Sequence, residues 1–293
     1  MNKTINIAID CGNFNYNTDA GVIFSSMFCV DDGASPLDEP RITFDGVTYL
    51  IGKGERDLTY NKTEKKYIQS LLYAIHKNLE ELNELKTENY INLCIGCPLD
   101  NKGLKEKFIA ELEGKTFEYV VDGIERSVKI EHLLVIGEGI SSFYSLGKST
   151  REKSTVIFDI GGLSVNICSF INGRLEHNFT YPKGMLNVQE EIRLRINSNG
   201  NNQELKDIER LINDNLIENV EIEYNKFVNE FMNFAKIKIK IENYSELLFT
   251  GGGSIRLKDS IKNNVVRAKF FDDPLFSNVK GNKKLLNSKK WSD

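Results

Sequence analysis

The sequence contains the same kind of turn twice, and this repeat constrains the fold more than any other feature. Ser154–Phe170 reads STVIFDIGGLSVNICSF, in which an apolar run ends abruptly at Asp159 and a glycine turn follows. An apolar run bounded by turn residues is typical of a buried strand. Near the N-terminus, alternating apolar residues lead to Asp10 and Gly12, and Asp159 follows Asp10 by 149 residues. That offset is about half of the 293 residues, so we expect two similarly built lobes.

An Asp-x-Gly turn suits the binding of a polyphosphate and its metal ion. Glycine lets the backbone approach a phosphate, and the N–H groups of the turn form an anion nest. The carboxylate can hold Mg²⁺ directly or through water. A glycine such as Gly162 can also simply bend a strand pair with no ligand present. The second copy of the turn favours the ligand site, so we expect each lobe to offer one turn to a shared cleft.

Bulk properties exclude several classes of protein. The length exceeds that of a usual single domain, the net charge is -4, and the basic residues are dispersed, although Lys280–Lys290 form a modest basic tail. No apolar run approaches the ~20 residues that span a bilayer. The start, MNKTINIAID, has too short an apolar core for a signal peptide. We therefore expect a cytoplasmic protein with no membrane partner and no direct nucleic-acid footprint.

The five cysteines, an odd number, fit unpaired thiols in a reducing compartment. Cys94 and Cys97 have C-x-x-C spacing, which invites a redox or zinc interpretation. The sequence has no second C-x-x-C, and its histidines, His76, His132 and His177, are scattered. The cysteine pair also closes an apolar strand, where small buried cysteines are ordinary. The structural interpretation is therefore favoured.

Hydrophobic periodicity and turn signals predict a mixed α/β protein, in which each lobe runs hairpin, strand, helix, strand. In the first lobe we expect strands at 4–10 and 22–30, a hairpin at 41–51, helices at 64–86, 102–112 and 140–146, and strands at 90–97, 116–121 and 125–136. In the second we expect a hairpin at 165–180, helices at 185–196, 203–213, 221–240, 254–261 and 275–286, and strands at 247–249 and 265–271. This order does not match an all-parallel nucleotide-binding fold.

Two further features are candidates for chemistry. Gly251–Gly253 follow a short strand and open a helix, where backbone N–H groups can bind an anion or ribose and glycine admits a flat base. Glu138 lies between glycines at the end of an apolar run, where a carboxylate can orient or deprotonate a water molecule. The alternative for Glu138 is a solvated loop residue or a charge at a helix N-terminus. The sequence has neither a G-x-x-x-x-G-K-[ST] loop nor a Ser-His-Asp order, which disfavours P-loop and serine-hydrolase chemistry.

The ordered set of these motifs resembles a known superfamily. Asp10-Cys-Gly, Glu138, Asp159-Ile-Gly-Gly and Thr250-Gly-Gly-Gly are similar, in this order, to the phosphate 1, connect 1, phosphate 2 and adenosine motifs of the actin, Hsp70 and sugar-kinase superfamily. Within it, the chain is most similar to bacterial actins of the ParM type, the plasmid-segregation ATPases. Supporting stretches are CIGCPL at 94–99, YPKGM at 181–185 and DPLFSNVKG at 273–281.

The resemblance implies an actin-like α/β fold with two ribonuclease-H-like lobes around a nucleotide cleft. Lobe I would be 1–150, with a small insertion subdomain at about 31–86, and lobe II 151–293, with its C-terminal helix packing back on lobe I. Asp10 and Asp159 would hold Mg²⁺ through water, and Glu138 would position the attacking water. The remaining contacts to ATP would come from Gly12, Asn13, Phe14, Asn15, Gly161, Gly162, Leu163, Gly184, Gly251, Gly252 and Gly253.

Two positions depart from the pattern of the family. The first loop of the family often carries a lysine shortly after its glycine, and the aligned position here is Asn17. The second loop usually continues G-T-x-x-D, whereas this chain has Leu163, Ser164, Val165 and Asn166. One positive charge and one carboxylate are absent from these places. We therefore expect the departures to affect the rate of hydrolysis more than the binding of nucleotide.

The resemblance implies a polymerising ATPase whose homopolymer filaments move plasmid DNA indirectly, through a DNA-binding adaptor protein of the ParR type. The alternative is a kinase of the same superfamily that phosphorylates a sugar or an acid. Assembly with Mg²⁺–ATP distinguishes the first, and ATP consumption stimulated by a sugar without light scattering distinguishes the second. A chaperone ATPase is disfavoured, because 293 residues leave no room for a separate peptide-binding domain.

Overall fold

The computed structural model describes residues 3–54, 66–97 and 103–291, which form two compact units. Unit 1 contains Met1–Leu146 and Phe276–Asp293, and unit 2 contains Gly147–Leu275. Pro98 and Leu99 of the predicted CIGCPL motif, and the first residues of the helix predicted at 64–86, lie outside the described residues.

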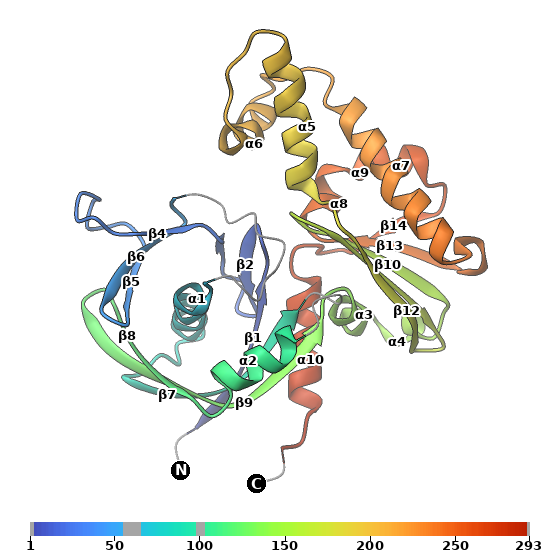
Figure 1. Ribbon diagram of the computed structural model, residues 1–293. Helices are drawn as coiled ribbons and strands as arrows, with labels where there is room; N and C mark the ends of the chain where they lie inside the picture. Colours follow the sequence, from blue (N-terminus) through green and yellow to red (C-terminus); the bar gives the residue numbers. More distant parts are fainter. Residues whose placement is uncertain (1–2, 55–65, 98–102, 292–293) are drawn as a thin grey trace. The chain divides into compact units, whose positions relative to one another are not determined.

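Unit 1 contains a nine-stranded sheet with the order β3-β2-β1-β7-β9-β8-β5-β6-β4 (Figure 1). Its strands are β1 (Thr4–Cys11), β2 (Asn15–Thr18), β3 (Ile23–Ser25), β4 (Phe28–Val30), β5 (Arg41–Phe44), β6 (Val47–Ile51), β7 (Glu88–Cys97), β8 (Thr116–Val121) and β9 (Ile124–Gly137). Its helices are α1 (Ile68–Glu81), α2 (Leu104–Leu112), α3 (Ile140–Ser145) and α10 (Ser277–Ser288). The central strands β1, β7 and β9 are parallel neighbours.

Both faces of these central strands are covered, so they bury apolar side chains on each face. Ile7 and Ile9 belong to the core cluster that contains the buried side of α1. Ala8 and Cys94 belong to a second cluster with Val279 of α10. Successive side chains of a strand point to opposite faces, so β1 is fixed between two helices. Figure 1 shows α1 inside the curve of the sheet and α10, in red, on the other side of the central strands.

Unit 2 contains a five-stranded sheet with the order β12-β11-β10-β13-β14. Its strands are β10 (Thr155–Ile160), β11 (Val165–Ile171), β12 (Arg174–Tyr181), β13 (Glu246–Thr250) and β14 (Ala268–Phe270). Its helices are α4 (Lys148–Arg151), α5 (Met185–Ser198), α6 (Leu205–Asn213), α7 (Glu221–Lys238), the 3-10 helix Ile241–Asn243, α8 (Gly252–Arg256) and α9 (Lys258–Asn264). Val156, Phe158 and Ile160 of β10 pack into one core cluster with α5, α6 and α7.

The two units repeat the same core. In unit 1, β2 pairs antiparallel with β3 and β1, and β1 pairs parallel with β7, which pairs parallel with β9. In unit 2, β11, β12, β10, β13 and β14 are connected in the same way. The strands that carry Asp10 and Asp159 therefore hold equivalent places, and the predicted repeat of two similarly built lobes is confirmed.

The Asp-Gly and Asn-Gly pairs form the predicted hairpin turns. Asp45 and Gly46 have φ of 51° and 72°, and Asp122 and Gly123 have φ of 53° and 72°. At the third turn, Asn172 and Gly173 have φ of 50° and 78°. A two-residue turn with positive φ at both positions matches the twist of the strands that it joins, and Asp, Asn and Gly tolerate this conformation best. These pairs thereby set the register of three hairpins.

Several predicted boundaries are wrong. The strand predicted at 22–30 is two short strands, and the preceding polar segment contains β2, which pairs with β1 and buries Tyr16 against Phe24 with ring centroids 5.3 Å apart. Helix α1 ends at Glu81, because Asn83 adopts a positive φ of 55°. The strand predicted at 265–271 is only Ala268–Phe270, and the helix predicted at 254–261 starts at Gly252 and breaks at Leu257.

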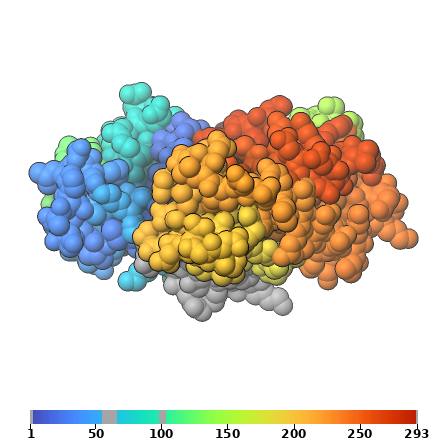
Figure 2. Space-filling model, turned by 90° about the horizontal axis from the view of Figure 1, so that it is seen from above, coloured from blue at the N-terminus to red at the C-terminus, as the bar shows by residue number. Residues whose placement is uncertain are grey.

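Helices α5 and α6 form part of the solvent-exposed surface of unit 2. They are drawn in yellow and gold in Figure 2. Ile208 is the buried residue of α6, Leu211 and Ile212 pack partly buried against the core, and Lys206, Arg210 and Asn213 are exposed. Within the described part of the chain, none of the helices combines the length and the apolar character needed to traverse a bilayer.

Candidate functional site

The end of the central strands of unit 1 brings two predicted carboxylates together. Because β1, β7 and β9 are parallel, their carboxyl ends meet at one edge of the sheet, where ligands of such sheets commonly bind. Asp10 follows Ile9 in register beside Gly96, and the Glu138 N–H donates to the Cys97 carbonyl at 2.8 Å. A Cβ added at Gly96 would lie 3.4 Å from both Asp10 Oδ1 and Glu138 Cγ. Both acidic side chains therefore border the space above Gly96.

The loop that follows Asp10 is tight. A Cβ at Gly12 would lie 2.6 Å from the Asn15 carbonyl oxygen, so no other residue fits without moving backbone. Ser26 stabilises the same loop by two hydrogen bonds. Its hydroxyl donates to the Asn13 carbonyl at 2.6 Å, and its N–H donates to the Phe14 carbonyl at 3.0 Å. The predicted residues from Gly12 to Asn15 thus form one fixed loop.

This loop borders a pocket that lies entirely within unit 1. Gly12, Asn13 and Gly96 line it together with Lys66, Tyr67 and Ser70 at the start of α1. Lys66 is exposed and brings a positive charge to the loop that lacks the lysine of the family pattern. Lys66 was not among the predicted site residues, because it is far from the loop in sequence and belongs to no local motif.

Helix α10 fixes the turn that carries Glu138. The Gly139 N–H donates to the Asn278 side-chain oxygen at 3.2 Å. A Cβ at Gly281 would overlap the Ser141 carbonyl oxygen, so α10 contacts the backbone of α3 directly. The position of Glu138 consequently depends on a helix from the far end of the chain.

In unit 2, the Asp159 turn and the glycine cluster are in contact. Asp159 is the penultimate residue of β10, is 6% exposed and is the register partner of Thr250 on β13. Gly251 has a φ of 80°, and its added Cβ would lie 2.5 Å from Asp159 Oδ1. A Cβ at Gly253 would overlap the side chain of Ile160. Gly251 and Gly253 are therefore required for this close approach, whereas Gly252 is exposed.

Gly184 packs directly against the backbone of the second loop, Gly161–Leu163. A Cβ at Gly184 would lie 2.5 Å from the Gly162 carbonyl carbon and oxygen. The first N–H groups of α5 hold the same loop, with Met185 donating to Gly161 O at 3.0 Å and Leu186 to Gly162 O at 2.8 Å. The start of α5 therefore holds this loop by two backbone hydrogen bonds. The last residue of the loop, Leu163, has a buried side chain.

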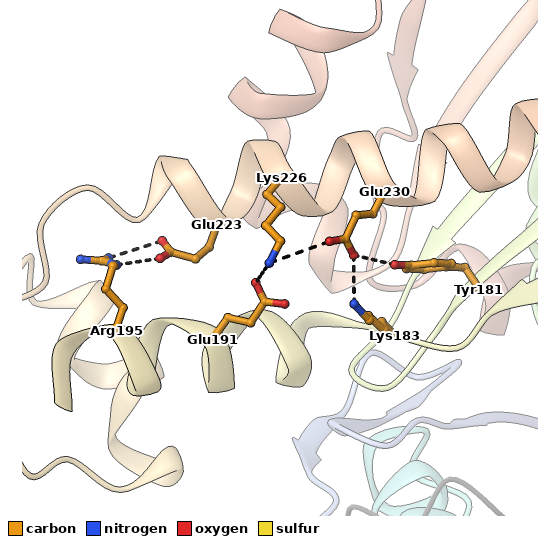
Figure 3. Close-up of polar contacts among 7 residues, drawn as sticks. All are labelled: Tyr181, Lys183, Glu191, Arg195, Glu223, Lys226 and Glu230. Carbon is orange, nitrogen blue, oxygen red and sulfur yellow. Dashed lines mark hydrogen bonds and ion pairs between the residues drawn. The ribbon is translucent and has the colours of Figure 1, made fainter. Parts of the chain in front are cut away.

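A polar network ties the segment before Gly184 to α7 (Figure 3). Glu230 accepts hydrogen bonds from the Tyr181 hydroxyl at 2.7 Å and from Lys183 Nζ at 3.1 Å. Burial raises the pKa of Glu230, but these two hydrogen bonds outweigh burial and leave the pKa below its ordinary value. Further pairs along α5 and α7 are Lys226 with Glu191 at 2.7 Å and Arg195 with Glu223 at 2.6 Å.

Two asparagines occupy equivalent places beside the two aspartates. Asn17 is the register partner of Asp10, and Asn166 is the register partner of Asp159. They are 7% and 3% exposed, and the Thr180 hydroxyl donates to Asn166 Oδ1 at 2.9 Å. In the sequence, Asn17 and Asn166 were recognised only as departures from the family pattern. The signal that finds them is their common spacing, seven residues after each aspartate.

The predicted site residues thus form two constellations, one in each unit. Unit 1 contributes Asp10, Glu138 and the loop Gly12–Asn15, and unit 2 contributes Asp159, Gly184 and the two glycine turns. That both constellations bind one nucleotide stays a prediction.

The cysteine pair does not converge on one point. Cys94 lies in the cluster with α10, whereas Cys97 packs against the cluster on the α1 side. Residues three apart in a strand point to opposite faces. Burial also raises the pKa of the Cys94 thiol well above its ordinary value, which disfavours the reactive thiolate.

Comparison with known proteins identifies relatives of this architecture. Residues 8–140 match the family model described as actin like proteins N terminal domain. The fold is similar to a 15-stranded ParM filament from Clostridium botulinum (17% identity, 98% of this chain and 100% of that chain, TM-score 0.80). It is also similar to an archaeal actin homologue (16%, 98% and 100%, TM-score 0.80) and to an AlfA filament bound to AMPPNP (18%, 97% and 96%, TM-score 0.65). No curated protein matches the sequence.

Proposed function

We propose that this chain, which is an actin-like protein with the fold of ParM, binds and hydrolyses ATP and assembles into filaments that segregate plasmid DNA. The predicted fold class, an actin-like α/β protein, is confirmed by the family model and by the similar structures. Nucleotide binding and hydrolysis are inferred from the residues of the two constellations and from the AMPPNP-bound AlfA filament. Assembly is inferred from the filament structures whose fold is similar.

The repetition of the site carries the proposal. In each unit the first strand of the core carries an aspartate as its penultimate residue, a tight glycine turn follows, and a buried asparagine on the next strand is the register partner of that aspartate. The donors fit Mg²⁺, which prefers oxygen ligands such as the carboxylates of Asp10 and Asp159. The loops fit phosphate, because Gly12 and Gly184 keep side chains out of turns that a phosphate must approach closely.

We assign a role to each constellation. Asp10 and Asp159 would hold Mg²⁺ through water, and the bound ion would neutralise charge on the β- and γ-phosphates. The loops Gly12–Asn15 and Gly161–Leu163 would bind these phosphates. The Gly161 N–H already donates to Ser164 O at 2.9 Å, so phosphate contacts in the second loop would fall to the N–H groups after it.

The remaining residues would orient the reaction. Glu138 would orient the attacking water, because its side chain borders the same space as Asp10. Gly251–Gly253 would line the adenosine, and Lys66 would add positive charge beside the first loop. Phosphoryl transfer needs little beyond alignment and charge neutralisation, which these parts can supply.

Assembly is proposed from the nature of the similar structures. One is a ParM filament and another is an AlfA filament bound to AMPPNP. We propose that this chain also forms a homopolymer by head-to-tail contacts that do not close into a ring. Nucleotide state would bias the conformation of the subunit and hence its contacts. An adaptor of the ParR type would connect the filament to plasmid DNA in the cytoplasm, where the five free cysteines stay reduced.

Substitution of Glu138 tests the hydrolytic role. Glu138→Gln is expected to keep the affinity for Mg²⁺–ATP and to lower the steady-state release of phosphate about 100-fold or more, within the range of general acid–base contributions. Glu125→Gln, at the exposed opposite end of β9, is the matched control. Phosphate release at the wild-type rate in Glu138→Gln would remove Glu138 from the mechanism.

Light scattering and electron microscopy test assembly. With Mg²⁺ and either ATP or a non-hydrolysable analogue, the full chain is expected to scatter light above a critical concentration and to form filaments. A chain that stays monomeric at high concentration contradicts the proposal. Sugar-stimulated consumption of ATP without scattering would instead identify a kinase.

A further inference from the structure

A second cluster of possible ligands lies in unit 1, apart from the strand ends. His76 and Glu80 are one helical turn apart in α1, and Asp122 lies in the turn between β8 and β9. One ligand atom from each of the three side chains lies within 4.8 Å of the other two. Figure 1 shows α1 inside the curved sheet to which β8 and β9 belong. Residues distant in sequence thus converge on one point.

His76 is buried without a hydrogen bond to any described residue, which is unusual for a histidine that serves only the packing of the core. Its side chain is 1% exposed, and neither ring nitrogen has a hydrogen-bond partner within the described part of the chain. A buried polar group without a partner destabilises the folded state, so such a group calls for an explanation. The ring packs edge-on against Tyr119, with centroids 5.9 Å apart, which fixes its plane.

We propose that His76, Glu80 and Asp122 bind a divalent transition-metal ion of the Zn²⁺ type. Imidazole nitrogen and carboxylate oxygen are both Zn²⁺ ligands in proteins, and a water molecule would complete a tetrahedral coordination around the three side chains. Mg²⁺ and Ca²⁺ prefer oxygen donors only, so the histidine selects against them. Burial, and next the charge of Arg126, lower the pKa of His76 to about 4, so the ring is neutral at physiological pH, as metal binding requires.

The surrounding charges set the affinity of the site. The four charged groups that act on the ring are Glu80 and Asp122, which favour a cation, and Lys77 and Arg126, which oppose it. Lys77 pairs with Glu80 in the metal-free chain. The metal ion must therefore compete with Lys77 for this carboxylate. Its binding would connect the end of α1 to the β8–β9 hairpin and stabilise the folded chain.

Titration of the nucleotide-free full chain with ZnCl₂, followed by calorimetry and thermal unfolding, tests the proposal. Asp122→Asn removes the charge but keeps a residue that tolerates the positive φ of the turn. Asp45→Asn is the matched control, because Asp45 holds the same place in another Asp-Gly turn, with a φ of 51°. We expect Zn²⁺ to bind Asp122→Asn at least about tenfold more weakly than Asp45→Asn, since even outer partners of a ligand contribute 10–100-fold.

Two more variants give independent readouts. Glu80→Gln is expected to lose Zn²⁺ affinity, whereas Glu81→Gln, its exposed neighbour on the same helix, keeps it. Lys77→Gln removes the competitor and is expected to bind Zn²⁺ several-fold more tightly. Free thiols are potential Zn²⁺ ligands, so the test is the difference in Zn²⁺ affinity between matched variants that share the same cysteines. Equal Zn²⁺ affinity in Asp122→Asn and Asp45→Asn, or an unchanged affinity in Lys77→Gln, overturns the proposal.

Discussion

Replacing Gly96 by alanine would place one methyl group between the two carboxylates of unit 1. The new Cβ would lie 3.4 Å from Asp10 Oδ1 and from Glu138 Cγ, which is a close but tolerable contact. Glycine inside a strand costs about 0.5–1 kcal/mol relative to alanine. The free energy of unfolding without nucleotide is therefore expected to stay constant or to rise by that amount.

The effect on ligand binding should be opposite in sign. The methyl group takes the space in which a water ligand of Mg²⁺ or an attacking water would contact Asp10 or Glu138. A hydrogen bond to a charged group contributes about 1.5–3 kcal/mol, and 1.4 kcal/mol corresponds to a factor of ten. We therefore expect Gly96→Ala to bind Mg²⁺–ATP about 10- to 150-fold more weakly.

Calorimetry with a non-hydrolysable ATP analogue and Mg²⁺ measures the affinity, and thermal unfolding without nucleotide measures the stability. Gly147→Ala is the matched control, because its added Cβ would have no atom within 4 Å and its φ of -67° suits alanine. Wild-type affinity in a stably folded Gly96→Ala would show that the space between the two carboxylates is not part of the nucleotide site.

Three further predictions concern other parts of the chain. Gly184→Ala should lower the free energy of unfolding of unit 2 by about 1–3 kcal/mol in denaturant titrations, because its Cβ meets the backbone of Gly162, and an unchanged midpoint would contradict this. Hydrogen bonds from two lysines lower the pKa of Glu246, so its stabilisation is present at neutral pH and is lost as the pH falls through that pKa. Glu246→Gln should accordingly cost about 1–2 kcal/mol at pH 7 and little once the pH is below the lowered pKa of Glu246 in the folded chain, and an equal cost at both pH values would contradict it. Lys66→Gln should weaken binding of ATP more than of ADP in calorimetry, and equal effects would exclude contact with the γ-phosphate.

Much of the core could be predicted from local patterns. The alternating apolar residues before Asp10 and the apolar run before Asp159 mark the first strand of each unit, because a glycine turn bounds both segments. The Asp-Gly and Asn-Gly turns gave correct hairpins, because few other residue pairs tolerate two positive φ values. Both signals lie within a few consecutive residues, and the tertiary contacts of the folded chain favour the same strands and turns.

Features that depend on tertiary contacts could not be predicted. The polar segment Asn15–Thr18 forms a strand because it pairs with β1 and buries Tyr16, and neither fact is visible in its composition. Lys66 reaches the first loop only through the position of α1. His76 looked isolated in the sequence, but the fold brings Asp122 beside it.

The binding of one nucleotide by both aspartate turns is tested most directly by a calorimetric titration. The wild-type chain, Asp10→Asn and Asp159→Asn would be titrated with a non-hydrolysable ATP analogue in excess Mg²⁺. We expect one nucleotide per wild-type chain and at least about tenfold weaker binding in each variant, since a charged ligand contact contributes 1.5–3 kcal/mol. Two nucleotides per chain, or wild-type affinity in either variant, would contradict this arrangement.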